Sequence, residues 1–472
     1  MERHRAADHP AGAAHLRHRT TQAGLRPDGR CRQGLNAQPP KGNTMKRRSF
    51  LVAGSVGTVA ALTGCVQAKS GGGSQNSGSG PVKLTFSSYA FQEPTVKAVD
   101  EIVKSWNSTH PDIQVELQKV DPSSVHDKLV TQFAGNAAPD IIHNESADLS
   151  GFTRQGYLAD LGPLLPAELK SAIPQAMWDS CTFDGKLTGV PLIAQLYVVF
   201  ANTKLLQEAG ITVPRAGSNW TWEELMANSK KLTAGDRSGF AWGMKSPTAG
   251  LLSMAMNYDG KYFYGNEAKP EMKIGEPELK LPRMLKQMLQ EKSMAANSVS
   301  LSGSDVLPGF FGGKYAMFMG GNFQSVQVAQ KAPPGFEWTM LPPLKGSTIG
   351  QTANPQTLSI ARQSKAPDKA MQFIAYFAQA QNLAKFAEGD ALLPVTKEAS
   401  ELVKKSTGGK NGWDALLSSP EALVAAPMIK ADKYSQWKSE VGNPTFQEFF
   451  SGKIDEAAMV SKLTQGWQKA NA

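Results

Sequence analysis

The pattern of apolar and polar residues between positions 82 and 142 predicts alternating strands and helices. Val82–Ser87 alternates apolar with polar side chains, as a strand with one buried face does. Pro94–Asn107 instead places its apolar residues three and four positions apart, the spacing of one helix face. A strand over Ile113–Leu117, a helix over Val125–Phe133 and a strand over Asp140–Ile142 follow. This βαβαβ order predicts a parallel sheet covered by helices.

The rest of the chain continues the alternation without an internal repeat. Asp184-Gly185 is typical of a hairpin turn, and Thr221 with Glu224 forms a capping-box pattern at a helix start. The further elements that we expect are strands over Tyr197–Phe200, Lys314–Met319 and Leu358–Ala361, and helices over Thr203–Ala209, Thr221–Leu232 and Pro367–Glu388. A body of this length predicts two α/β lobes.

The front of the chain has a different pattern, which indicates an export signal rather than a folded domain. Residues 1–44 show no apolar period, so we expect them to be disordered or to precede the true start. Residues 45–64 combine a basic head with an apolar run shorter than the roughly 20 residues of a membrane-spanning helix. The run ends in Leu62-Thr63-Gly64-Cys65, which resembles a lipobox, the site of lipid attachment in bacterial lipoproteins.

These features predict a lipid-anchored protein on the outer face of the cytoplasmic membrane. Cys65 would carry the lipid, and the Gly- and Ser-rich residues 65–80 would form a flexible tether. Arg47-Arg48 followed by Ser49-Phe50-Leu51 also resembles a twin-arginine signal, but a general secretory route stays open.

Charge and cysteine content exclude several classes of protein. The net charge is +9, but residues 1–64 hold 11 basic and 3 acidic residues, which leaves 39 basic and 38 acidic residues in the remainder. The nearly neutral body does not favour nucleic acid as a partner. Cys31, Cys65 and Cys181 form no metal-ligand spacing, and His143 belongs to no helical histidine pair, so no metal and no cofactor are expected.

Six short stretches, in this order, resemble the family 1 extracellular solute-binding proteins, the group that contains the maltose-binding protein. They are Gly135–Ile142, Gln155–Leu161, Gly185–Pro191, Tyr197–Lys204, Asn219–Leu225 and Lys314–Phe323. The resemblance implies an α/β, two-lobed, periplasmic-binding-protein-like fold with mainly parallel sheets. Lobe 1 would comprise residues 81–195 plus 350–392, and lobe 2 residues 196–349 plus 393–472. The chain would cross first near Ile193–Leu196 and return near Gly346–Ala353.

The resemblance also implies a function. A monomeric substrate-binding protein of an ABC importer would close its lobes on a sugar or oligosaccharide and deliver it to transmembrane permease subunits. Sugars are bound by aromatic faces together with polar side chains. The aromatic candidates are Phe323, Trp242, Tyr258 and Trp437, with Tyr434 as an alternative to Trp437. The polar candidates are Tyr89, Gln92, Asn144, Glu145, Gln195, Asn322 and Asn354.

Other functions stay open at this point. Asn144, Ala147 and Asp148 stand where the maltose-binding relative has a Trp, a carboxylate and an Arg, so maltodextrin specificity is not implied. The same fold could bind a non-sugar solute such as a glycerol phosphate, a peptide or a metal–siderophore complex. A secreted carbohydrate-active enzyme or a scaffolding lipoprotein are further alternatives. No catalytic motif such as G-x-S-x-G or HExxH is present, so we expect no catalytic residues.

Overall fold

The computed structural model describes residues 80–122 and 124–472, which belong to one compact unit. The expected start region, signal segment and lipidated Cys65 lie outside the described residues, as does all of the tether but Gly80.

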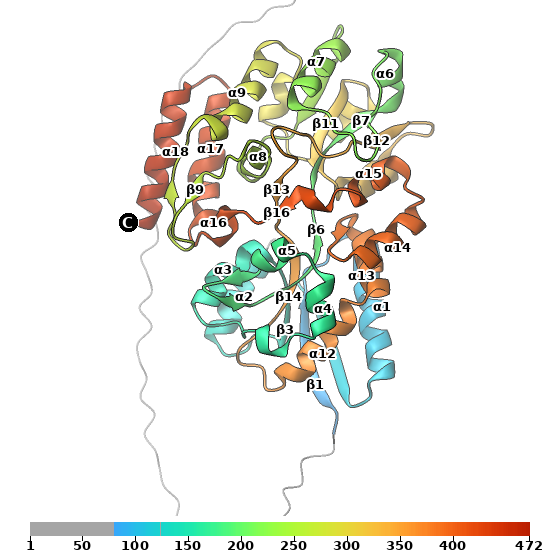
Figure 1. Ribbon diagram of the computed structural model, residues 1–472, viewed down its shortest axis with the longest axis vertical. Helices are drawn as coiled ribbons and strands as arrows, with labels where there is room; N and C mark the ends of the chain where they lie inside the picture. Colours follow the sequence, from blue (N-terminus) through green and yellow to red (C-terminus); the bar gives the residue numbers. More distant parts are fainter. Residues whose placement is uncertain (1–79, 123) are drawn as a thin grey trace, which may run out of the picture. The chain divides into compact units, whose positions relative to one another are not determined.

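A six-stranded sheet forms the core of the first lobe (Figure 1). Its strands, from one edge to the other, are β15 (Leu393–Pro394), β6 (Val190–Ala194), β14 (Gln356–Ile360), β3 (Ile141–Glu145), β1 (Val82–Ser88) and β2 (Ile113–Lys119). Its longer helices are α1 (Glu93–Thr109), α2 (Val125–Ala134), α3 (Ser146–Arg154), α12 (Pro367–Phe377), α13 (Ala380–Asp390) and α14 (Lys397–Thr407). The βαβαβ order predicted for residues 82–142 is present as β1, α1, β2, α2 and β3.

A four-stranded sheet forms the core of the second lobe. Its order is β12 (Trp338–Met340), β7 (Tyr197–Asn202), β11 (Tyr315–Gly321) and β8 (Ser238–Trp242). The helices are α6 (Thr203–Glu208), α7 (Trp222–Leu232), α8 (Thr248–Ala255), α9 (Glu276–Gln290), α10 (Leu307–Phe311), α11 (Gln324–Lys331), α16 (Tyr434–Trp437), α17 (Asn443–Phe450) and α18 (Glu456–Asn471). The predicted capping box is present, with the side chains of Thr221 and Glu224 each accepting from the other's backbone.

Shorter elements complete the chain. The three two-stranded sheets pair β4 (Thr182–Phe183) with β5 (Lys186–Leu187), β9 (Phe263–Tyr264) with β10 (Glu271–Met272), and β13 (Gln351–Thr352) with β16 (Leu423–Val424). The remaining α-helices are α4 (Ala167–Ala172), α5 (Gln175–Asp179) and α15 (Trp413–Leu417). At the predicted hairpin turn, Asp184 and Gly185 both have positive φ, as a tight turn between β4 and β5 requires.

The two-lobed α/β fold agrees with the prediction, but the expected mainly parallel pairing is wrong in detail. Parallel pairing joins β1 to β2 and β3, and β11 to β8, whereas the other pairs in the two main sheets are antiparallel. The reason lies in the connections between lobes. A strand such as β14 returns from the second lobe and enters the first sheet at the edge where β1 and β3 end, so it must run against them.

The chain crosses between the lobes three times, and one expected boundary needs correction. The first crossing falls between β6 and β7, at Gln195 and Leu196, the return lies between β12 and β14, and the third crossing lies between α14 and α16. The expected boundary after residue 392 is too early, because Leu393 and Pro394 pair with β6 of the first sheet. Helix α14 then packs against α13, so lobe 1 extends past this boundary.

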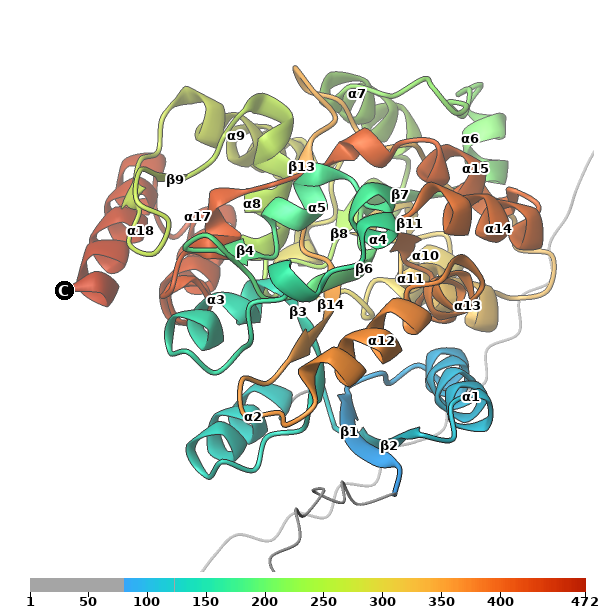
Figure 2. The same ribbon diagram turned by 60° about the horizontal axis from the view of Figure 1, so that its bottom comes forward.

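The single long helix expected over Pro367–Glu388 is also wrong, because two helices, α12 and α13, occupy this stretch (Figure 2). Gln379 is extended, with φ −60° and ψ 145°, and the Tyr376 carbonyl accepts from the Asn382 side chain at 2.8 Å and from the Gln379 N–H at 3.2 Å. The break lets α13 pack on α1. It contains no Gly or Pro that the sequence could have signalled.

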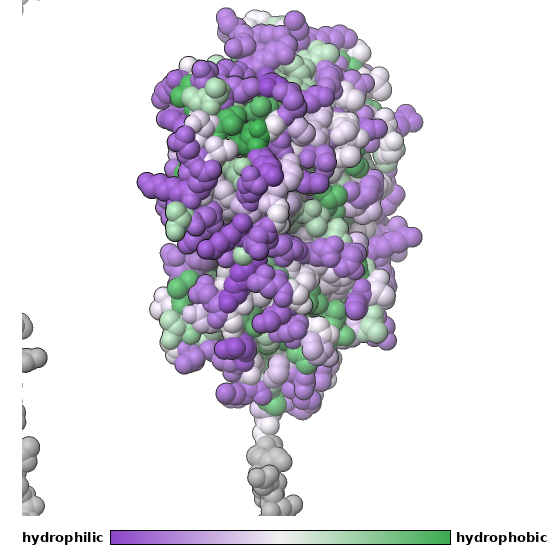
Figure 3. All heavy atoms as spheres, turned by 60° about the vertical axis from the view of Figure 1, so that its left-hand side comes forward, coloured by the Kyte–Doolittle hydropathy of each residue, from purple (hydrophilic) through white to green (hydrophobic). Residues whose placement is uncertain are grey.

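The interior is apolar and the surface is mostly polar. Trp106 packs edge-to-face against Phe373 in the first lobe, and Phe200 lies parallel to Phe318 in the second. Cys181 is buried with a free thiol. The face in Figure 3 is mostly hydrophilic, with hydrophobic side chains in small separate areas. Within residues 80–122 and 124–472, no helix is long and apolar enough to cross a membrane.

Candidate functional site

A cavity of about 420 Å³ lies between the two lobes. Strands β1, β3 and β6 end at it, and β14 begins at it, so loops of the first sheet form one wall. Residues around the first crossing, the loop before α11 and the segment around α16 form the opposite wall. The candidates that line it are Tyr89, Gln92, Glu145, Gln195, Phe323 and Asn354, together with the alternative Tyr434.

Phe91 is the most unusual residue of this cavity. Its side chain is 58% exposed, and the only other large hydrophobic residue described as exposed is Val130 at 44%, which does not line the cavity. A Phe left in contact with water at a cavity is typical of a binding surface rather than of a core. Sequence reasoning missed Phe91, although Tyr89 and Gln92 of the same loop were predicted.

Carboxylates outnumber cationic groups in the cavity lining. Glu145, Asp148 and Asp390 face a single ammonium group, that of Lys438. Desolvation raises the pKa of each of the three carboxyl groups, and the charge of Asp148 raises the pKa of Glu145 further. The positive charge of Lys438 lowers the pKa of Glu145 and Asp148 in part, so Lys438 attracts these two carboxylates across the cleft.

Asn354 positions the start of α3 at the cavity. Its side-chain oxygen accepts hydrogen bonds from the Ser146 hydroxyl at 2.9 Å and the Ala147 backbone N–H at 3.0 Å. Its amide nitrogen donates to Glu145 at 3.0 Å. Asn354 therefore caps the N-terminus of α3 by accepting from a backbone N–H that has no partner within the helix. The side chain of the N-cap residue, Glu145, makes no such hydrogen bond.

A chain of buried hydrogen bonds lies behind the first wall. Gln356 donates to Asp390 at 3.1 Å, so its oxygen must accept from His143 Nε2 at 2.8 Å. His143 Nδ1 then accepts from the Ser88 hydroxyl at 3.1 Å. Burial lowers the pKa of His143 to about 4, so this histidine is neutral at pH 7 and joins the network as a single tautomer.

The same network holds the loop that carries Phe91. Gln92 donates to the Asp390 carboxylate at 3.3 Å, and Thr95 also donates to it. The Tyr89 ring stacks on His143 with centroids 4.2 Å apart. Both sides of the exposed Phe91 are thus fixed to buried groups.

Two tyrosines that line the cavity have hydroxyls without a hydrogen-bond partner among the described residues. Tyr89 and Tyr434 are buried, and burial raises the pKa of each well above its usual value. The charges of Glu145, Asp390 and Asp148 raise that of Tyr89 further, which places its hydroxyl within their field. Burial also raises the pKa of Tyr197 to about 12. Unpaired hydroxyls at a cavity are suited to a polar ligand.

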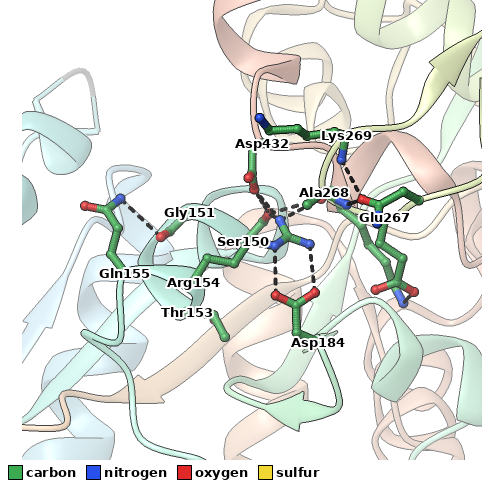
Figure 4. Close-up of polar contacts among 12 residues, drawn as sticks. Ser150, Gly151, Thr153, Arg154, Gln155, Asp184, Glu267, Ala268, Lys269 and Asp432 are labelled. Carbon is green, nitrogen blue, oxygen red and sulfur yellow. Dashed lines mark hydrogen bonds and ion pairs between the residues drawn. The ribbon is translucent and has the colours of Figure 1, made fainter. Parts of the chain in front are cut away.

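Arg154 joins the lobes beside the cavity (Figure 4). This α3 residue donates to Asp184 of its own lobe at 3.0 Å and to the Lys430 carbonyl of the second lobe at 2.9 Å. It also forms an ion pair with Asp432, whose backbone N–H donates to Ala268. The arrangement in Figure 4 shows the guanidinium between Asp184 and Asp432, so one cation bridges two lobes.

The structure places five of the predicted site residues elsewhere. Trp437 is fully buried beside Trp467 and donates to the Leu463 carbonyl at 3.1 Å. Trp242 is buried behind Tyr197, and Tyr258 lies under the Lys280 ammonium. The prediction that these three aromatic residues contact a ligand is therefore not supported by the cavity. A buried Trp and an exposed one look alike in a sequence.

Asn144 and Asn322 also lie outside the cavity lining. Asn144 accepts from the Glu145 N–H at 2.9 Å, so it shapes the end of β3. Asn322 accepts from the Leu196 N–H at 3.0 Å and donates to the Ala391 carbonyl at 2.8 Å. Asn322 therefore ties the first crossing to the segment after α13, a structural role at the hinge.

Several cavity residues were not predicted. The main ones are Phe91, Tyr197, Gln356, Asp390 and Lys438. Asp390 ends α13 and Lys438 follows α16, both late in the chain, and no local motif marks them. Among residues 80–122 and 124–472, no cluster of three metal-binding side chains occurs, and His143 uses both ring nitrogens within the hydrogen-bonded network.

Comparison with known proteins identifies the family. The model of the bacterial extracellular solute-binding protein family matches residues 88–384, and the chain belongs to this family. An uncharacterized lipoprotein from the oleD 5' region of Streptomyces antibioticus is 34% identical over 392 residues, covering 82% of this chain and 86% of that relative. The maltodextrin-binding protein MdxE of Bacillus subtilis is 25% identical over 355 residues, covering 71% of this chain and 79% of that one.

Solved structures show the same fold. The sugar-binding protein MalE from Xanthomonas citri has a TM-score of 0.73 at 22% identity, covering 82% of this chain and 97% of that one. The cyclic alpha-maltosyl-1,6-maltose binding protein from Arthrobacter globiformis has a TM-score of 0.71 at 16% identity, covering 83% and 99%. These likenesses establish the two-lobed binding-protein architecture.

Proposed function

We propose that this protein is the extracytoplasmic substrate-binding lipoprotein of an ABC importer and that it captures a sugar or oligosaccharide between its lobes. The observation that carries the proposal is the exposed ring of Phe91 in a cavity that amide, hydroxyl and carboxylate groups also line. A sugar ring has apolar C–H faces and a polar rim, and it needs both kinds of partner at once. The relatives named as maltodextrin- and arabinooligosaccharide-binding proteins support this ligand class.

The charge of the cavity argues against a phosphorylated ligand. A phosphate group would be expected to meet arginine or several cations. Here Lys438 is the single cationic residue in the lining, beside three carboxylates. A glycerol phosphate is therefore a poorer candidate than an uncharged or cationic solute.

The placement of the acidic groups also argues for binding rather than hydrolysis. Glycosidases place two carboxyl groups on either side of the scissile bond. Glu145 and Asp148 instead stand side by side at the start of α3, and Asp390 is held by donors from Gln92, Thr95 and Gln356. All three carboxylates belong to the first lobe, so no two of them face each other across the cleft.

The membrane anchor is part of the proposal. Cys65 would be acylated, and the tether would keep the body near permease subunits of the same importer. The name lipoprotein given to the Streptomyces antibioticus relative supports this arrangement. Mass spectrometry of the protein isolated from its native membrane would detect a lipid on Cys65, and an unmodified Cys65 would contradict the anchor.

Thermal unfolding of the purified protein with a saccharide panel tests the binding function. A ligand that binds only the folded state raises the melting temperature by mass action. We expect one class of saccharide to do so and to be recovered chemically unchanged by chromatography. If every saccharide is without effect, the sugar assignment fails, and if a saccharide is consumed, the protein is an enzyme.

A further inference from the structure

We infer that the preferred ligand carries a protonated amino group, as in an amino sugar, and that Glu145 and Asp148 bind this group at the cavity wall of the first lobe. The inference rests on the proposed function, because it names the chemical class of saccharide that the same cavity selects. Its basis is the position of the two carboxylates, the charge around them and the groups beside them.

The carboxylates are available to a ligand. Both line the cavity at the start of α3, and Asn354 rather than Glu145 accepts from the backbone at the helix start. Glu145 accepts one hydrogen bond, from Asn354, through a single oxygen. Within residues 80–122 and 124–472, the Asp148 carboxylate accepts no hydrogen bond and forms an ion pair with the exposed His126 at 4.0 Å. The remaining oxygens of the pair can therefore accept N–H donors from a ligand.

The surrounding charges do not balance the pair. The charged and titratable groups that face it are Lys438 and Tyr197 from the second lobe, His126 from α2, and Asp390 and Tyr89 behind it. Lys438 supplies one positive charge against three carboxylates. By formal charge, the lining therefore has an excess of two negative groups.

Lobe closure makes this imbalance matter. A neutral sugar would seal Glu145 and Asp148 away from water with Lys438 as the one counter-charge for the three carboxylates of the lining, and burying an excess of like charges is unfavourable. An ammonium group would supply the charge and up to three donors at the same place. Charged hydrogen bonds are therefore expected to favour the amino form over its acetamide or hydroxyl counterpart.

Two aromatic residues fit the same ligand. Phe91 presents an exposed ring at the cavity, and a ring face attracts a cation as well as C–H groups. The Tyr89 hydroxyl has no partner among the described residues, is at least nine-tenths buried, and lies within the field of all three carboxylates. It can donate to a ligand oxygen next to the amino group.

Isothermal titration of the purified full chain with matched saccharides tests the inference. The probes are glucosamine, galactosamine and mannosamine and their oligomers, each beside its N-acetylated and its unsubstituted form. At pH 6.5 we expect an amino form to bind about tenfold more tightly than its N-acetyl partner, the size of one charged hydrogen-bond pair. Equal or weaker binding of every amino form would overturn the inference, while the proposed sugar function would stand.

Variants locate the effect. In the double variant Glu145→Gln/Asp148→Asn the preference for the amino form should fall below about twofold, whereas Glu116→Gln, an exposed change outside the cavity, should retain it. Melting temperatures establish that each variant folds. A preference that survives the double variant would contradict the assignment of these two residues. If no saccharide of either kind binds, the proposed function itself fails.

Acidification gives an independent readout. As the pH falls, Glu145 and Asp148 take up protons, so affinity for the amino form should decline while that for the N-acetyl form changes little. The sign follows from the raised pKa of both groups, which a bound cation would lower again. A parallel decline for both forms would contradict a charge-specific contact.

Discussion

The two walls of the cavity are held in place by different forces. The wall of the first lobe rests on buried hydrogen bonds that run from Ser88 through His143 and Gln356 to Asp390. The wall of the second lobe, around α16, rests on aromatic packing of Trp437 against Phe263 and Trp467, at centroid distances of 5.8 and 6.0 Å. Hydrogen-bonded titratable groups respond to pH, whereas packed rings do not. The first wall should therefore be pH-sensitive and the second wall sensitive only to loss of volume.

The largest effect should come from the packing of the second wall. Trp437→Ala removes a fully buried ring and should lower the free energy of unfolding by about 3–5 kcal/mol, as measured by urea denaturation. Trp437→Phe keeps most of the packing and serves as the control. A variant of normal stability that loses only ligand affinity would instead make Trp437 a binding residue.

The first wall should show a pH-dependent effect of similar size. His143 has its pKa lowered from 6.5 to about 4, so the unfolded chain takes up this proton first as the pH falls. The contribution of neutral His143 to the free energy of unfolding is complete above pH 6.5. It falls by about 3 kcal/mol as the pH is lowered to 4. The raised pKa values of Glu145, Asp148 and Asp390 have the opposite effect, because they increase the free energy of unfolding as the pH falls. This effect is the same in the natural protein and in a variant that lacks only His143. His143→Gln should therefore lose less stability than the natural protein between pH 7 and pH 4 in urea titrations.

The contact between the walls should have the smallest effect. Arg154→Met removes the bridge to Asp432 and should weaken ligand binding about fivefold, since partly exposed ion pairs contribute about 1 kcal/mol. Arg283→Met is a matched control, because Arg283 joins Glu276 and Glu456 within the second lobe. Equal losses of affinity in both variants would show that Arg154 does not act through lobe closure.

The sequence predicted the elements better than their connections. Strong periodicity marked β1, α1 and β2, whose buried residues repeat at strand and helix spacing. The break between α12 and α13 was not predictable, because tertiary packing and not a helix-breaking residue creates it. The direction of β14 likewise depends on the return from the other lobe.

For the site, the position of a residue in a loop after a strand helped to predict that it lines the cavity. Whether an aromatic side chain is buried could not be predicted from the sequence. Loops after the strands of the first lobe led to Tyr89, Gln92 and Glu145, which line the cavity. Aromatic residues chosen by alignment, Trp242 and Trp437, lie in the interior. Asp390 and Lys438 reach the cavity only through the late crossings of the chain, which no local pattern reveals.

Calorimetry of two variants tests most directly whether the exposed ring of Phe91 binds a sugar. Phe91→Ala and Val130→Ala each remove an exposed apolar side chain, but only Phe91 lines the cavity. The ligand is the saccharide found by thermal unfolding. We expect Phe91→Ala to bind it about tenfold more weakly than the natural protein, because an aromatic contact contributes about 0.5–1.5 kcal/mol beyond its buried area. Val130→Ala should bind it with unchanged affinity. Unchanged affinity in Phe91→Ala would contradict the account.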